Sequence, residues 1–157
     1  MPTPTYIPLQ TITLGSAASS VTFASIPQTY RDLVLVVNGT ASTGLDNRIQ
    51  FNGDTASNYS EVRMYGVGTA GSDTTAGGNI RIGDLYSTQS NNIVQVMDYS
   101  ATEKHKTILS RGNSATNSTI AIAGRWASTS TITSINVFVA TGNYVSGSTF
   151  SLYGIEA

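Results

Sequence analysis

The sequence predicts an all-β protein: a single antiparallel β-sandwich domain over residues 1–157, jelly-roll-like, with about ten short strands. Apolar residues occur in short segments, several with a period of two, separated by clusters of Gly, Ser, Asn and Asp. No stretch of a dozen residues repeats apolar positions at helical spacing, so the helical crossovers typical of parallel sheets are not expected. With 157 residues, 39% of them hydrophobic, the chain is long enough to bury a core.

The strands are expected in the apolar segments between turn signals. In chain order these are 5–14, 20–24, 32–38, 47–52, 60–65, 79–85, 93–99, 106–110, 119–126, 131–140 and 148–156. The alternation is clear at 119–126, where Ile120, Ile122 and Trp126 fall on one face of the strand. Such a face is typical of a strand that covers a core on one side.

Three segments are expected outside the strands or at their margin. The glycine-rich stretch 66–79 and the segment 111–119 predict solvent-exposed loops. Residues 1–9 contain three prolines, which disfavour regular secondary structure. We expect this segment to be either an extended arm that docks on a neighbouring molecule or a frayed terminus.

The segment "LVLVVNGTASTGLD" at 33–46 has the glycine spacing of a phosphate-binding loop. Such a loop also requires a lysine, a hydroxyl residue and a following helix, whereas Leu45 and Asp46 stand here and another strand pattern follows. We therefore expect no nucleotide site. The run at 33–37 instead predicts a central strand covered by the opposite sheet and, on its other face, by a neighbouring subunit.

Composition disfavours several classes of partner. Charged residues make up 11% of the chain, against about 25% in an average domain, and the formal net charge is −1. Such a chain has no cationic field for nucleic acid or an anionic membrane, so neither partner is expected. Because there is no cysteine, disulfides and thiolate metal sites are excluded.

The residues that could carry chemistry do not form a recognisable catalytic motif. His105 is the only histidine and stands between Lys104 and Lys106, so a metal site or a catalytic triad cannot be assembled from the sequence pattern. The aspartates lie in or beside turns, where Asp commonly bonds to the backbone. We expect no enzyme and no cofactor. The two lysines are expected at an exposed strand end, where an electrostatic contact with a partner is the alternative.

Tyrosines are the remaining candidates for binding, because they combine a broad apolar ring with a polar tip. Tyr6 and Tyr59 are expected to be exposed, whereas the others are expected to pack within or at the ends of strands. The candidate interface residues are Thr3, Tyr6, Ile7, Tyr59, Lys104 and Lys106.

Four phrases of the chain carry a resemblance. They are "LGSAASSVTFASIPQTYRDLVLVVNG" at 14–39, "NYS" at 58–60, "AGRW" at 123–126 and "TSINVFVATGNYVSGSTFSLYGIEA" at 133–157. With these the chain resembles small all-β structural proteins of tailed bacteriophages, including those that infect cyanobacteria. The pattern S-I-P-x-T-Y-x-D-L-V-L at 25–35 and the "LYGI" finish at 152–155 are the most specific parts, although Arg31 stands where the first pattern has a neutral residue.

The resemblance implies a component of the virion. The leading expectation is a capsid decoration, or cement, protein that lies on the outer capsid surface, binds the major capsid protein and assembles as a homotrimer. The alternative is a module of the tail or fibre that binds a host-surface glycan through exposed aromatic rings. A glycan hydrolase is the third and least favoured reading.

Overall fold

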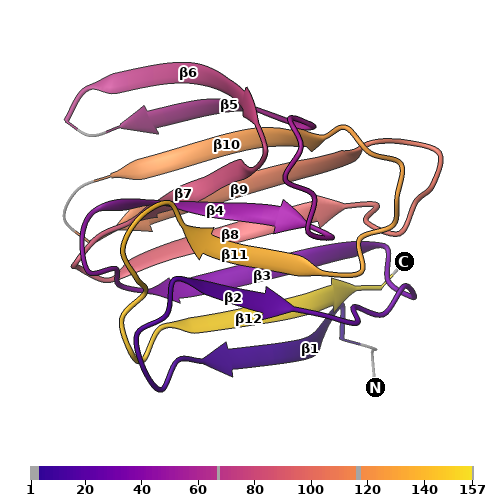
Figure 1. The fold of residues 1–157 in the computed structure, drawn as a ribbon, viewed down its shortest axis with the longest axis horizontal. Coiled ribbons are helices and arrows are strands. Elements are labelled where there is room, and N and C mark those ends of the chain that lie inside the picture. Colours follow the sequence, from indigo (N-terminus) through magenta and orange to yellow (C-terminus); the bar gives the residue numbers. More distant parts are fainter. Residues whose placement is uncertain (1–3, 67, 116–117, 157) are drawn as a thin grey trace.

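The computed structural model describes residues 4–66, 68–115 and 118–156, which form strands and connecting loops without a helix in these ranges. Two sheets face each other (Figure 1). The larger sheet contains, in spatial order, β1 (Tyr6–Thr13), β12 (Thr149–Ile155), β3 (Asp32–Gly39), β8 (Ser90–Met97), β9 (Lys106–Ser114), β10 (Thr119–Trp126), β5 (Tyr59–Gly66) and β6 (Ala70–Gly77). The smaller sheet contains β2 (Ser20–Phe23), β11 (Ile135–Val139), β4 (Leu45–Phe51) and β7 (Ile80–Leu85).

The strand order confirms the predicted antiparallel sandwich. Neighbouring strands are antiparallel throughout both sheets. The order β1-β12-β3-β8 opposite β2-β11-β4-β7 is the connectivity of an eight-stranded jelly roll built from two Greek keys. Two hairpins are added to it: β5–β6 between β4 and β7, and β9–β10 between β8 and β11. Because β10 pairs with β5, the two hairpins together extend the larger sheet by four strands.

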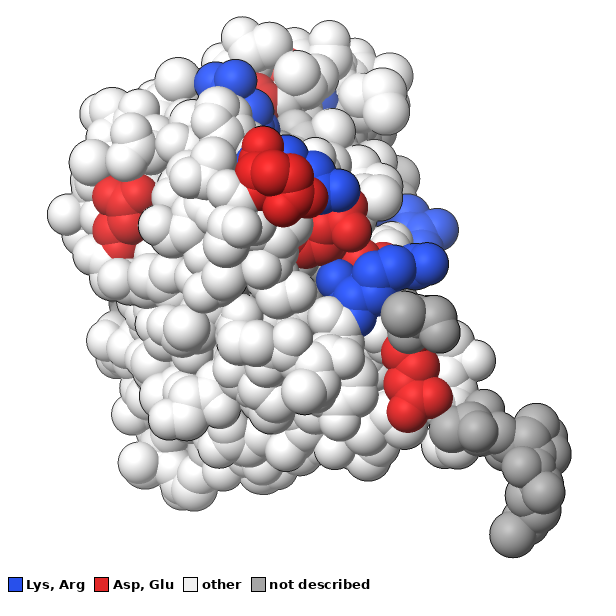
Figure 2. Space-filling view, turned by 90° about the vertical axis from the view of Figure 1, so that its right-hand side faces the viewer, with Lys and Arg blue, Asp and Glu red and all other residues white. Residues whose placement is uncertain are grey.

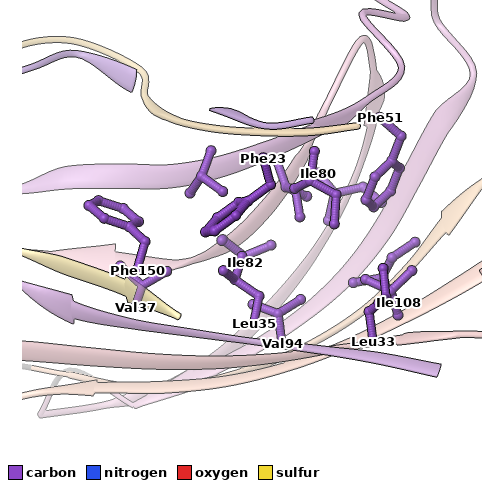
Figure 3. Close-up of a cluster of buried hydrophobic side chains, with 14 of the residues drawn as sticks. Phe23, Leu33, Leu35, Val37, Phe51, Ile80, Ile82, Val94, Ile108 and Phe150 are labelled. Carbon is purple, nitrogen blue, oxygen red and sulfur yellow. The ribbon is translucent and has the colours of Figure 1, made fainter. Parts of the chain in front are cut away.

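The core lies between the sheets and is built from alternate residues of each strand. Leu33, Leu35 and Val37 of β3 are completely buried, as is Val94 of β8. Figure 3 shows Leu35 and Val94 on the side of the core opposite Phe23 of the smaller sheet, and Leu33 opposite Phe51. The expectation that 33–37 is covered by the opposite sheet is therefore confirmed. Burying a side chain of this size contributes roughly 1.5 to 3 kcal/mol.

A buried chain of hydrogen bonds joins the two sheets within this core. The Tyr144 hydroxyl donates to Oδ1 of Asn47 on β4 (2.7 Å), and Nδ2 of Asn47 donates to Oδ1 of Asn92 on β8 (2.8 Å). Gly112 on β9 leaves the space that the Asn92 amide fills, because a Cβ at Gly112 would overlap Nδ2 of Asn92. These buried polar groups satisfy each other, which fixes how the sheets sit together.

Two of the expected loops are wrong in part. Within 66–79 the chain forms β6, which pairs residue by residue with β5, and Arg63 of β5 forms an ion pair with Asp73 of β6. Within 111–119, strand β9 continues to Ser114. Small and hydroxyl residues gave no apolar alternation here, but backbone pairing with a neighbouring strand does not require one.

The segment 1–9, expected as an extended arm or a frayed terminus, joins the sheet from Tyr6 onward. Residues from Tyr6 onward form β1 at the edge of the larger sheet, paired with β12, and Met1–Thr3 lie outside the described residues. Pro8 is tolerated because an edge strand has one side without hydrogen-bonding partners. The register shifts between Pro8 and Gln10, which indicates a bulge at this point of the edge.

Candidate interaction surface

The surface most unlike an ordinary solvated exterior is the outer face of the larger sheet. Six large apolar side chains are exposed among the described residues, and one of them, Val145, lies outside this face in the β11–β12 loop. The others point outward from the larger sheet: Tyr6 (56% exposed), Val62 (51%), Met64 (61%), Ile93 (41%) and Leu109 (44%). We call the surface formed by these five residues the apolar face. Contiguous exposed apolar surface of this kind is typical of interaction sites.

Strand pairing places these side chains in two neighbouring rows. One row contains Val62, Ala123, Leu109, Gln95 and Val34, each opposite the next on adjacent strands. Alternate residues of a strand share a face, so the residues two positions along each strand form the second row. The sequence of that row is Met64, Ala121, Arg111, Ile93 and Val36.

Val34 shows that this face is apolar even below its exposed residues. Its neighbours Leu33 and Leu35 point into the core, whereas Val34 points outward and is nevertheless only 7% exposed. Tyr6 contributes to the same surface, where its ring meets the ring of Tyr153 edge to face at 6.3 Å.

Hollows deepen the apolar face. A groove of about 510 Å³ is lined by Tyr6, Val34, Met64 and Leu109 among others. Two further hollows adjoin it over the added hairpins: one of about 750 Å³ beside Met64 and Arg111, and one of about 580 Å³ beside Val62 and Arg125. The small residues Ala121 and Ala123 line these depressions between larger neighbours. The surface is therefore shaped to receive protruding side chains.

The charged side chains at this site are Arg111 and Arg125, beside the hollows, and the other described charges lie elsewhere. Figure 2 shows that many charged side chains on one end of the molecule gather in the upper right part of the view, with an acidic patch apart from them at the left, and that most of the view is uncharged. Beside β7, at the edge of the smaller sheet, Asp46 binds Arg81 (2.8 Å) and Arg48 (2.9 Å), and the backbone N–H of Arg81 donates to Glu61 (2.6 Å). Burial raises the pKa of Glu61. These groups neutralise each other where β7 packs against the added hairpins.

Of the predicted interface residues, Tyr6 lies on the apolar face, whereas Ile7, the next residue of β1, points to the opposite face of the sheet. Ile7 is half-buried in β1 opposite Gly154, and Thr3 lies outside the described residues. Lys104 is exposed in the β8–β9 loop, where its ammonium contacts Asp98 at 2.8 Å and this hydrogen bond raises the pKa of Lys104. The structure thus does not bring these candidates together into one site.

The expected exposure of Tyr59 is wrong. The ring is 1% exposed and stacks on Trp126, with the two planes 17° apart. The hydroxyl accepts a hydrogen bond from the backbone N–H of Phe51 (3.1 Å) and donates to the carbonyl of Asp54 (3.1 Å). Burial raises the pKa of Tyr59 to about 12. Both rings belong to the core, so neither can stack on a ligand.

The expected exposure of Lys106 is also wrong. This side chain is fully buried, and its ammonium donates to the carbonyl oxygens of Ala101 (2.6 Å), Lys104 (3.2 Å) and Thr129 (3.4 Å). Burial lowers the pKa of Lys106. Lys106 therefore ties the β8–β9 loop to the loop after β10 and is not available to a partner.

The exposed apolar residues were not among the sequence candidates, although a signal for them exists. In β8, Ile93 and Val94 are consecutive apolar residues, and in β9 Ile108 and Leu109 are too. Consecutive apolar residues in a strand place one on each face of the sheet. Such a pair indicates that the outer face is also apolar, but strand register is needed to see that the outward residues form one surface.

No protein-family model matches the chain, and no curated protein matches its sequence. Among the described residues, no group of three or more histidine and acidic side chains could hold a metal ion. The same part of the chain contains no helix that could span a membrane.

Proposed function

We propose that this protein is a structural component of a phage virion, a capsid decoration protein that binds the outer shell and stabilises contacts between major capsid proteins. The apolar face of the larger sheet is the observation that supports this proposal. A protein that acts by passive binding requires such a surface and requires no reactive groups. The resemblance to phage structural proteins gives the class of partner.

The proposed mechanism is mass action. Burial of Val62, Met64, Ile93 and Leu109 against the shell would favour the assembled lattice, because a ligand that binds only the assembled state stabilises it. Removing apolar area from water contributes roughly 25 cal/mol per Å². Assembly as a homotrimer belongs to the same proposal and is tested by sedimentation velocity of the purified protein.

The alternative, a tail or fibre module that binds a host glycan, would require exposed aromatic rings for stacking. Trp126 and Tyr59 are buried, and Tyr6 is the aromatic residue that the apolar face offers. The other exposed side chains of the apolar face are aliphatic. They can pack against a protein partner, but they cannot stack on a sugar ring as aromatic side chains do.

Co-sedimentation with capsids tests the proposal. Capsids of the encoding phage that lack this protein are mixed with wild type or with the Met64→Asp or Leu109→Asp variant. We expect wild type to bind and each variant to lose at least tenfold in affinity, because each buries a carboxylate in an apolar contact. Both residues are exposed, so folding is expected to persist.

Val145→Asp is the matched control, since Val145 is also an exposed aliphatic residue but lies outside the apolar face. It should bind like wild type. Equal binding of Met64→Asp, Leu109→Asp and wild type would contradict the proposed docking face. Binding to host glycans with no affinity for capsids would establish the alternative instead.

A further inference from the structure

We propose that the partner binds the apolar face with a surface that combines apolar side chains with two carboxylates. The carboxylates are spaced so that one meets Arg111 and the other Arg125. This inference deepens the proposed function, on which it rests for the use of the same face. It concerns the chemistry of the partner, which the resemblance does not supply.

Arg111 and Arg125 are the cations of the outer face. Both side chains are exposed, and neither forms an ion pair with any of the described residues. The other described arginines, at 31, 48, 63 and 81, are each paired with an aspartate. In a chain with so few charges, two unpaired guanidinium groups beside an apolar surface are suited to an anionic partner.

The face presents no accessible carboxylate of its own. Among the described strand residues that point outward from the larger sheet, the acidic residue is Asp32, whose side chain is 4% exposed. It accepts hydrogen bonds from Arg31, from Gln95 (3.3 Å) and from the backbone N–H of Asp98 (2.9 Å). Two copies of the protein packed face to face would therefore bring like charges together, which disfavours a second copy as the occupant.

The two arginines lie on either side of the row that contains Leu109 and Ala123. Arg111 is opposite Ala121, and Arg125 stands four residues farther along the same strand β10. At about 3.3 Å per residue, the row of Arg111 and the row of Arg125 are roughly 13 Å apart along the strands. Leu109 and Ala123 occupy the row between them. A partner strand with an apolar residue at its centre and an acidic residue two positions to either side has the same spacing.

Two synthetic peptides test this arrangement. Each is an extended seven-residue peptide with leucine at its centre; one has aspartate two positions to either side, and the other has lysine at those positions. Binding is followed by NMR of the labelled full-length protein. We expect the aspartate peptide to shift the amide resonances of Val62, Leu109 and Ala123, with at least tenfold higher affinity than the lysine peptide.

Charge reversal provides the decisive comparison. The double variant Arg111→Glu, Arg125→Glu should prefer the lysine peptide, because the two ion pairs are now formed with the opposite sign. Lys104→Glu reverses an exposed charge outside the face and should keep the preference for aspartate. Equal affinity for both peptides, shifts outside the apolar face, or an aspartate preference retained in the double variant would overturn the inference. So would binding to anionic phosphatidylserine vesicles without binding to the aspartate peptide.

The capsid assay separates this inference from the proposed function. Loss of capsid binding in the double variant supports both. Equal capsid binding by wild type and the double variant overturns the acidic partner and leaves the decoration role standing. An aspartate preference with no capsid binding by wild type overturns the decoration role and leaves the acidic-partner inference standing.

Discussion

Lys106 shows how a charged residue can serve the fold rather than a partner. Its ammonium donates hydrogen bonds to backbone carbonyls of two loops. Without this donor, these carbonyl oxygens would need water as a partner. Lys104, two residues earlier in the chain, is exposed and bonded to Asp98. The two lysines are therefore a matched pair with different environments.

Replacing Lys106 with methionine keeps most of the buried volume but removes the donors. We expect Lys106→Met to lower the free energy of unfolding by about 3 kcal/mol, because buried carbonyls lose their charged partner. Lys104→Met is the control and should leave the urea midpoint close to that of wild type, because its side chain is exposed. Equal midpoints for Lys106→Met and wild type would contradict the structural role of Lys106.

Asp54 predicts an acid-sensitive contribution to stability. Hydrogen bonds from Asn58 (3.0 Å), from the indole of Trp126 (2.7 Å) and from the backbone N–H of Ala56 (2.9 Å) lower its pKa below the ordinary value of 3.8. Because the folded-state pKa is lowered, this contribution is present above pH 3.8 and is lost as the pH falls through the folded-state pKa.

The Asp54→Asn variant tests that contribution by urea unfolding across the acidic range. Wild type should lose stability relative to the variant as the pH falls below 3.8. A difference between the two proteins that stays constant from pH 6 to the acid limit would show that ionisation of Asp54 contributes nothing.

The added hairpins are the elements that carry most of the apolar face, which we propose as the docking surface. Strands β9, β10 and β5 carry Leu109, Ala123 and Val62 outward, while their inward residues continue the core. Where one sheet extends beyond the other, the inner side of the extension is covered by β7 and by Phe51 of β4, whose ring packs against Tyr59 and Trp126. The charged groups around Arg81 lie at this margin, where fewer apolar side chains are available.

The close fit between β8 and β9 predicts the effect of filling it. Gly112→Ala should lower the free energy of unfolding by about 1 to 3 kcal/mol, because the added methyl displaces the Asn92 amide and breaks the hydrogen bonds that join the sheets. Gly77→Ala on β6 is the control, since a Cβ there has no neighbour within 4 Å. Equal stability of the two variants in urea would contradict the proposed packing.

The sequence predicted the elements that combine apolar alternation with clear turn signals. Strand β10, with Ile120 and Ile122 on one face, is an example, and its position is confirmed. Strand β6 was missed because its small residues carry no alternation. The burial of Lys106 and Tyr59 and the grouping of exposed apolar residues depend on which strands become neighbours. That information is contained in long-range pairing and not in local pattern.

At the scale of the whole molecule, the two sides of the sandwich differ in character. The larger sheet presents a hollowed apolar face with two arginines that form no ion pair with the described residues, whereas the smaller sheet consists of four jelly-roll strands without an added hairpin (Figure 1). An asymmetric sandwich of this kind is suited to bind a surface with one side while the other remains in solvent. The resemblance to phage structural proteins makes the capsid shell the proposed surface.

Cryo-electron microscopy of the intact particle tests this account most directly. We predict density for the protein on the outer capsid, oriented so that β5, β9 and β10 contact the major capsid protein at Met64 and Leu109. Density on the tail, or on the capsid with the smaller sheet turned toward the shell, would contradict the account.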